Sequence, residues 1–190
     1  MSDNVNVLAF PAGKRSSEVS GSANSGETVD PALFKQGMRR LAAGVTIIAT
    51  DIGGARHGIV ATAVSSVSAD PPTLLVCVSE AASAHAFIGQ AGFFSVNVLH
   101  ADDQALAEHF ANPAKRAQRF DLGEWSRLTT GAPILLSALA SFDCRLTQKA
   151  RVGSHTVFFG QVEHLYLREG AVDPLLFWNG AYRRGHTESF

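Results

Sequence analysis

Apolar and β-branched residues in this chain gather in short runs that turn residues separate. Each run has the length and composition of a β-strand, and the short connections between them favour antiparallel pairing. Six segments predict strands in this way: residues 45–50, 60–68, 73–79, 93–99, 156–168 and 175–178. A further segment, residues 137–147, alternates apolar with polar positions and predicts a half-buried strand.

Three segments predict helices. The first has Asp30 at the N-cap and Pro31 at the first helical position, carries one apolar face, and is expected to end at Gly44. The other two are residues 80–88 and 102–110. Because these helices do not alternate regularly with the strands, a doubly wound parallel sheet is disfavoured. The pattern instead favours a mainly β protein, an antiparallel barrel with peripheral helices.

Turn residues connect the predicted elements. Residues 51–54 join the first two strands as a hairpin, and Pro71 and Pro72 end the second strand because proline donates no ladder hydrogen bond. Gly160 predicts a bulge or a point of close approach. The Ser-, Gly- and Asn-rich start of the chain predicts a disordered tail over residues 1–29, ahead of one domain over residues 30–186.

Composition narrows the class of protein. A length of 190 residues suits one domain, and 16 Lys and Arg against 17 Asp and Glu give a net charge of −1. This balance gives no reason to expect nucleic acid or a membrane surface as the main partner. No apolar run reaches the ~20 residues that span a bilayer, and no signal-peptide pattern is present, so we expect a cytoplasmic protein.

The cysteines give little support for metal chemistry. Cys77 and Cys144 are the only cysteines, and both lie in apolar, strand-like segments. Two isolated cysteines lack metal-site spacing, so we expect two reduced, buried thiols and no metal.

GxGxxG, GxxxxGK[ST] and GxSxG motifs are absent, so Rossmann, P-loop and hydrolase-elbow chemistry is not indicated.

Hydroxyl groups around the second predicted strand are the strongest local signal for a ligand. Ser65, Ser66 and Ser83 could hold a phosphate together with backbone N–H groups, and Lys115 or Arg119 could add positive charge. The alternative is that these hydroxyls occupy the solvated face of a strand.

Two more segments leave a functional and a structural interpretation open. His155 follows a Gly-Ser pair at the start of a strand, where it either contacts a ligand or transfers a proton, or lies in a surface turn. Residues 180–184 carry Tyr182 and two arginines, and either close a pocket or form an exposed tail.

A series of short motifs recurs in one order over roughly residues 31–184. Its residues are Phe34, Met38 and Gly44-Val45-Thr46-Ile47-Ile48, then Gly58, Thr62-Ala63, Ser65-Ser66-Val67-Ser68 and Pro71-Pro72, then Phe94, Val96-Asn97-Val98-Leu99, Leu106-Ala107, Phe110 and Arg119-Phe120, then Gly131, Pro133, Cys144, Gly153, His155 and Pro174-Leu175-Leu176. Each motif is weak alone, but the ordered series is specific. It resembles the short-chain flavin reductases, which are the reductase components of two-component flavin monooxygenases.

The resemblance implies a Greek-key split β-barrel and a homodimer with flavin near the subunit interface. It implies reduction of FMN or FAD by NADH or NADPH, and a monooxygenase component that receives the reduced flavin. It also implies that His155 is the catalytic residue, at the position associated with the nicotinamide. The residues that it implies for flavin binding are Thr62, Ala63, Val64, Ser65, Ser66, Ser79, Ser83, His85, Asn97, Arg119, Phe120 and Tyr182.

One position departs from the family pattern, and two other functions stay open. Many relatives carry Asp where this chain has Ser154, and a neutral hydroxyl does not orient or acidify His155 as a carboxylate would. A non-catalytic module that binds flavin or haem predicts retained cofactor without oxidation of NADH. A dimeric scaffold without cofactor predicts no stabilisation by FMN or FAD.

Overall fold

A computed structural model describes residues 28–185 of the chain. The predicted disordered tail therefore lies outside the described residues, apart from its last two positions. Within residues 28–185, no helix is long and apolar enough to cross a membrane.

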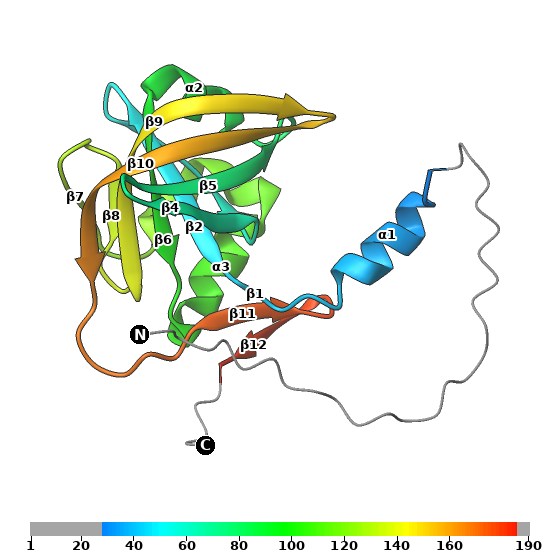
Figure 1. Ribbon diagram of the computed structural model, residues 1–190. Helices are drawn as coiled ribbons and strands as arrows, with labels where there is room; N and C mark the ends of the chain where they lie inside the picture. The colour runs from blue at the N-terminus through cyan, green and yellow to red at the C-terminus, as the bar shows by residue number, and fades with distance from the viewer. Residues whose placement is uncertain (1–27, 186–190) are drawn as a thin grey trace, which may run out of the picture.

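Seven strands form one antiparallel sheet that curls into a barrel (Figure 1). In spatial order they are β3 (Ala55–Ala61), β2 (Thr46–Ile52), β6 (Phe93–Val98), β9 (Ala140–Val152), β10 (His155–Leu167), β5 (Pro72–Ser79) and β4 (Val64–Ala69). Every neighbouring pair is antiparallel. The antiparallel barrel expected from the sequence is therefore confirmed.

Strands β3 and β4 follow one another in the chain but lie at opposite edges of this sheet. The chain leaves β2 after Ala61 and joins β5 at Val64, so the single strand predicted over residues 60–68 is wrong. Thr62 and Ala63 make the crossing, and the Cys77 N–H donates to the Ala63 carbonyl at 2.9 Å. The barrel is therefore split along the line between β3 and β4.

Two small sheets lie beside the barrel. One has the order β1 (Ala43–Gly44), β11 (Leu175–Trp178) and β12 (Ala181–Arg184), and the other pairs β7 (Trp125–Arg127) with β8 (Pro133–Leu135). The strand expected over residues 175–178 is confirmed, although β12 follows it. The other short strands carry too few residues for a periodic pattern to show.

The helices are shorter than the sequence pattern predicts. They are α1 (Pro31–Met38), α2 (His85–Ala91) and α3 (Gln104–Ala111), with 3₁₀ helices η1 (Ala101–Asp103) and η2 (Pro113–Asp121). Asp30 caps α1 as expected, because its carboxylate accepts from the Ala32 N–H at 2.7 Å. The predicted end at Gly44 is wrong, since Gly44 belongs to β1 and pairs with Leu176. Figure 1 shows α1 standing away from the barrel.

Strand β2 contributes to both hydrophobic clusters of the core, because successive side chains of a strand point to opposite faces. Ile47 packs in a cluster with Phe110 of α3, whereas Ile48 packs in a second cluster with Phe94 and with Ile88 of α2. These two clusters fix α3 and α2 to the sheet, and so fix the segment that precedes α2 and the 3₁₀ helix that follows α3.

Strand β9 corrects the expectation of a half-buried strand. Ser141 and Asp143, on its predicted polar face, are fully buried. The Asp143 carboxylate accepts hydrogen bonds from the N–H of Thr130, at 2.8 Å, and from the Thr130 hydroxyl. The segment between β7 and β8 therefore covers a face of β9 that local pattern assigns to solvent.

Gly160 and the cysteines test three further expectations. The register of β10 against β9 shifts at Gly160, where an added Cβ would lie 2.6 Å from the Phe94 ring, so the close approach is confirmed. Both cysteines are free. Cys144 is buried as expected, but Cys77 is only half-buried, because its side chain faces a cavity.

Candidate functional site

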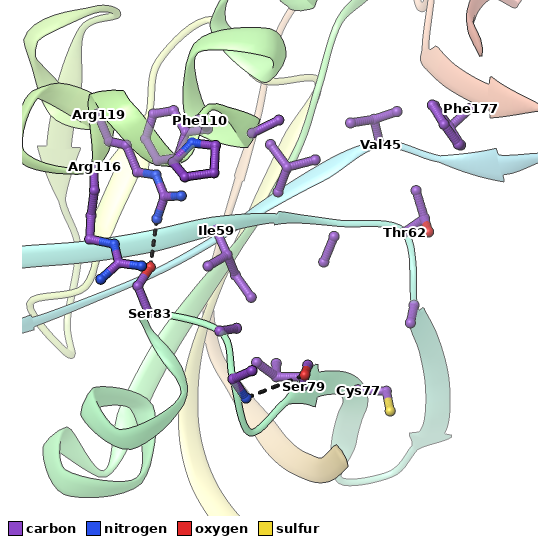
Figure 2. Close-up of a pocket in the computed structure, with 18 of the residues that line it drawn as sticks. Val45, Ile59, Thr62, Cys77, Ser79, Ser83, Phe110, Arg116, Arg119 and Phe177 are labelled. Carbon is purple, nitrogen blue, oxygen red and sulfur yellow. Dashed lines mark hydrogen bonds between the residues drawn. The ribbon is translucent and has the colours of Figure 1, made fainter. Parts of the chain in front are cut away.

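A cavity of about 570 Å³ lies at the split between β3 and β4. Its walls are β3 with the crossing at residues 62–63, the end of β5 with the turn after it, and the adjoining ends of α3 and η2. Figure 2 shows arginine side chains at one end of this cavity and Val45 with Phe177 at the other. The volume lies within the usual range for small-molecule sites.

Small side chains line the middle of the cavity, which we call the small-residue slot. Its members are Ala61, Thr62, Ala63, Cys77, Ser79, Ala81 and Ala82. None of these side chains extends far from the main chain, so a flat ligand can approach the backbone closely. The hydrogen bond from Cys77 to Ala63 ties the two walls of the slot together and fixes its shape.

Two guanidinium groups and one hydroxyl form the cationic end: Arg116, Arg119 and Ser83. Arg119 is only 8% exposed, and its Nη1 donates to the Gly58 carbonyl and to the Ser83 hydroxyl, at 2.7 Å in each case. Arg116 is exposed, and Figure 2 shows both arginines directed toward Ser83. No Asp or Glu of the described chain lines this cavity.

The surroundings of Arg119 disfavour the charged form of its side chain. Burial, and after it the nearby charge of Arg116, lower the pKa of Arg119. The side chain stays protonated at neutral pH because arginine titrates far above it. Its Nε atom is buried and has no hydrogen-bond partner among the described residues. An anion bound at the cationic end would offset the repulsion between the two guanidiniums.

The opposite end, which we call the aromatic end, carries no formal charge. Phe177 of β11 and Tyr182 of β12 line it, with their ring centroids 5.3 Å apart in an edge-on arrangement. Burial, followed by the charge of Glu108, raises the pKa of Tyr182. The phenol is therefore neutral, and this end suits an apolar part of a ligand.

The cavity brings together six of the residues singled out in the sequence. These are Thr62, Ala63, Ser79, Ser83, Arg119 and Tyr182. They come from four separate parts of the chain, between β3 and β12. Lys115, the alternative to Arg119 as a source of charge, does not line the cavity.

Other residues from the same set lie elsewhere. Val64, Ser65 and Ser66 continue into β4, where both serines are exposed, and none of the three lines the cavity. Phe120 packs against Phe110 and Trp125 behind the cationic end. In that position Phe120 supports the cavity wall without facing the cavity.

Three more of these residues lie apart from the cavity. Asn97 is fully buried; its amide donates to the Ile47 carbonyl and its oxygen accepts from the Leu135 N–H, so it joins β2, β6 and β8. The His85 imidazole lies 2.8 Å from the Thr156 hydroxyl and faces a second cavity. His155 is exposed, and its Nδ1 lies 3.0 Å from the Ser154 hydroxyl.

Several cavity residues are not indicated by the sequence pattern. The sequence pattern places Phe110 on a helix and Phe177 in a strand, and it assigns Cys77 to the hydrophobic core. In the sequence, Arg116 is noticeable only as one member of a cluster of basic residues. The spacing of Arg116 and Arg119, three residues apart, is the one signal that could assign both to the same side of a helix.

A flavin nucleotide fits this donor set. Its phosphate would be held by Arg119, Arg116 and Ser83, and its flat ring system would lie in the small-residue slot. The unpartnered Nε and lowered pKa of Arg119 are the features that an anionic ligand would offset.

Known proteins resemble the chain across this whole region. Residues 38–186 match the protein family described as flavin reductase like domain. An FMN reductase (NADH) RutF 1 of Methylorubrum extorquens is 44% identical over 155 residues, which cover 82% of this chain and 77% of that protein.

Two solved structures share the fold at moderate identity. The NADH:FAD oxidoreductase SgcE6 of Streptomyces globisporus C-1027, in complex with NAD and FAD fragments, has a TM-score of 0.78 at 30% identity, over 87% of this chain and 100% of that one. A nitrilotriacetate monooxygenase component B from Mycobacterium thermoresistibile has a TM-score of 0.77 at 30% identity, over 85% of this chain and 92% of that one.

Proposed function

Because the chain belongs to the flavin reductase like domain family, we propose that it is an oxidoreductase that oxidises NADH or NADPH and reduces FMN or FAD. One observation carries the proposal: a single cavity joins a cationic end to a small-residue slot. A flat cofactor with a phosphate needs both features in one site.

The protein's part in this reaction is to position the flavin and the pyridine nucleotide and to polarise the flavin ring. Bound flavin and pyridine nucleotide supply the hydride chemistry themselves. The small-residue slot would let the ring lie against the main chain, where the dipoles of the backbone would polarise it. Arg119, held in place by Gly58 and Ser83, anchors the phosphate and so sets the depth of the ring in the slot.

His155 is proposed to contact the nicotinamide. Its main chain pairs with Ser79, a residue of the slot, so His155 belongs to the strand next to the cavity wall. Its only side-chain partner among the described residues is the neutral Ser154 hydroxyl. We therefore assign His155 a positioning contact with the cosubstrate, because hydride transfer requires no general base.

Reduced flavin is proposed to leave for a separate monooxygenase component. Thr62, Ala63 and Ala81 are exposed, so the slot opens to solvent and gives a route for release. The name of the related nitrilotriacetate monooxygenase component B supports such a partnership. A cytoplasmic location is proposed with it, because free thiols belong to that compartment.

A homodimer that covers α1 is proposed as the working form. No residue of α1 is buried, and Leu33, Phe34 and Leu41, on or just after it, are 60%, 61% and 61% exposed. A cluster of large apolar side chains in water favours burial against a partner. Light scattering on the Phe34→Asp variant tests this: a dimeric wild type and a monomeric variant are expected, and a monomeric wild type contradicts the proposal.

Anaerobic mixing of the protein with FMN and NADH tests the enzymatic function. Loss of the visible absorbance of the flavin, at a rate that depends on the protein concentration, is expected. Steady-state oxidation of NADH and NADPH with FMN, FAD and riboflavin in turn would then define the preferred pair. Tight retention of flavin without any NADH oxidation would instead indicate a non-catalytic flavin-binding module.

A further inference from the structure

A second cavity, of about 460 Å³, lies between α2 and the β9–β10 hairpin. Residues 79–83 separate it from the first cavity, because Ser79, Ala81 and Ser83 line the first and Glu80 lines the second. The two cavities therefore share one wall.

The second cavity has a basic rim with an uncompensated charge. Lys149 and Arg151, both on β9, line it, and Glu80 is the one carboxylate among its described lining residues. Arg151 forms an ion pair with the Glu80 carboxylate, with a distance of 2.7 Å between Nε and Oε1. Lys149 forms no ion pair within residues 28–185, and its Nζ lies 3.8 Å from the position of a Cβ added to Gly89. The Lys149 ammonium group is therefore free to meet an anion above α2.

Ala86, Gly89 and Phe158 form the apolar part of the second cavity, which we call its floor. Ala86 and Gly89 lie one turn apart on α2, and the Phe158 ring edge is 4.0 Å from the same point above Gly89. His85 stands at the side, with its ring 5.4 Å from that of Phe158 and its Nε2 engaged with Thr156. A planar heterocycle can lie on this floor and meet the imidazole at its edge.

We propose that this second cavity binds the phosphate-bearing adenosine end of a nucleotide. The phosphate meets Lys149 and Arg151, and the adenine covers Ala86 and Gly89. Two sources carry this chemistry: the 2′-phosphorylated adenosine of NADPH, and a free adenine nucleotide. The first source rests on the proposed function. In the chain, His155 pairs with Ser79 of the small-residue slot, and the next residue, Thr156, lines the second cavity.

Calorimetric titration of the full-length protein with 2′,5′-ADP and with AMP tests the site without turnover. We expect binding of at least one ligand, weakened at high salt and weakened roughly fivefold or more by Lys149→Ala. The matched control is Arg145→Ala, which removes a cation of the same strand that pairs with Glu163 outside the cavity. Absence of binding, or equal binding by Lys149→Ala and wild type, overturns the proposal.

Steady-state kinetics distinguish the two sources. If NADPH occupies the site, Lys149→Ala raises the KM for NADPH and leaves that for NADH unchanged, and 2′,5′-ADP competes with NADPH. If a free nucleotide occupies it, AMP changes the rate with both donors and competes with neither. A wild-type protein that binds these ligands but oxidises neither donor contradicts the proposed function and leaves the second site standing.

Discussion

The cationic end and the small-residue slot are two regions of one cavity that are built in opposite ways. The cationic end depends on long side chains that are present and held, since Arg119 is fixed by the Gly58 carbonyl and the Ser83 hydroxyl. The slot depends on side chains that are short, as at Ala63 and Cys77. One region recognises charge and the other provides space.

This difference predicts how each region fails. Removing atoms should damage the cationic end, whereas adding atoms should damage the slot. FMN and riboflavin share the ring system and differ in the phosphate, so the pair of ligands separates the two effects. Loss of phosphate recognition changes the affinity for FMN alone, but loss of space changes the affinity for both.

The largest effect is expected from Arg119→Leu. This change removes a nearly buried cation, whose charge-assisted hydrogen bonds to a phosphate would each be worth about 1.5–3 kcal/mol, so FMN affinity should fall by about 100-fold. Riboflavin affinity should change far less. Quenching of flavin fluorescence measures both values, and urea unfolding measures the accompanying loss of stability.

Arg116→Ala is the matched control for this prediction. Arg116 is exposed, so its loss should lower FMN affinity only a few-fold, as for screened surface charges. Arg119→Lys should resemble Arg119→Leu more than wild type, because an ammonium group lacks the planar guanidinium, which binds Gly58 and Ser83 through Nη1 and keeps its other N–H groups for a phosphate. Equal effects at Arg116 and Arg119 would mean that burial does not distinguish the two arginines.

The second largest effect is expected from Cys77→Leu, which adds atoms to the slot. Cys77 is half-buried and lines the cavity, so a longer side chain should weaken FMN and riboflavin together, by roughly tenfold each. Cys77→Ser keeps the small volume and should stay close to wild type for both ligands. Unchanged riboflavin binding in Cys77→Leu would show that the flavin ring does not lie beside Cys77.

Much of the barrel could be predicted from local pattern, but the split could not. Apolar periodicity marks β2, β5, β6 and β10, because each strand buries a continuous face. The β-branched and small residues run without interruption from Val60 to Ser68, so nothing local marks the crossing at Thr62. That crossing is set by pairing with β2 on one side and β5 on the other, which are contacts distant in sequence.

Some residues of the candidate site could likewise be predicted from the sequence, and others could not. Ser83 and Arg119 have residue types that suit a phosphate, so the sequence could indicate them. Asn97 has a suitable type as well, yet its side-chain amide forms hydrogen bonds with the main chain of β2 and of β8. The resemblance places His85 near the flavin, but His85 faces the second cavity, because α2 begins only at residue 85 and turns its first residue away.

A smaller effect is expected from salt. Raising NaCl from about 50 to about 500 mM should weaken FMN binding a few-fold and leave riboflavin binding nearly unchanged, because ions screen the cationic end and not the slot. Titrations at several salt concentrations, with wild type and Arg116→Ala, measure the slopes. The variant should show the shallower slope, since it lacks the exposed cation. Parallel slopes for FMN and riboflavin would exclude a cationic phosphate site.

The smallest effect is expected at the aromatic end. Burial, and then Glu108, raise the pKa of Tyr182, so the folded state keeps this phenol protonated at a pH where the unfolded chain begins to lose the proton. The stabilisation is complete below about pH 10, the ordinary value for tyrosine, and is lost as the pH rises through the folded pKa. Between about pH 9 and 11 the free energy of unfolding should therefore fall more for wild type than for Tyr182→Phe.

Urea unfolding at several pH values measures this difference, and the ultraviolet absorbance of tyrosinate follows the phenol directly. At neutral pH Tyr182→Phe should bind FMN within about twofold of wild type, because a neutral ring remains in place and the phosphate lies at the other end. A large loss of FMN affinity at neutral pH would mean that the hydroxyl itself contacts the ligand. In that case the aromatic end would recognise flavin by hydrogen bonding, and the contrast between charge and space would not describe the whole cavity.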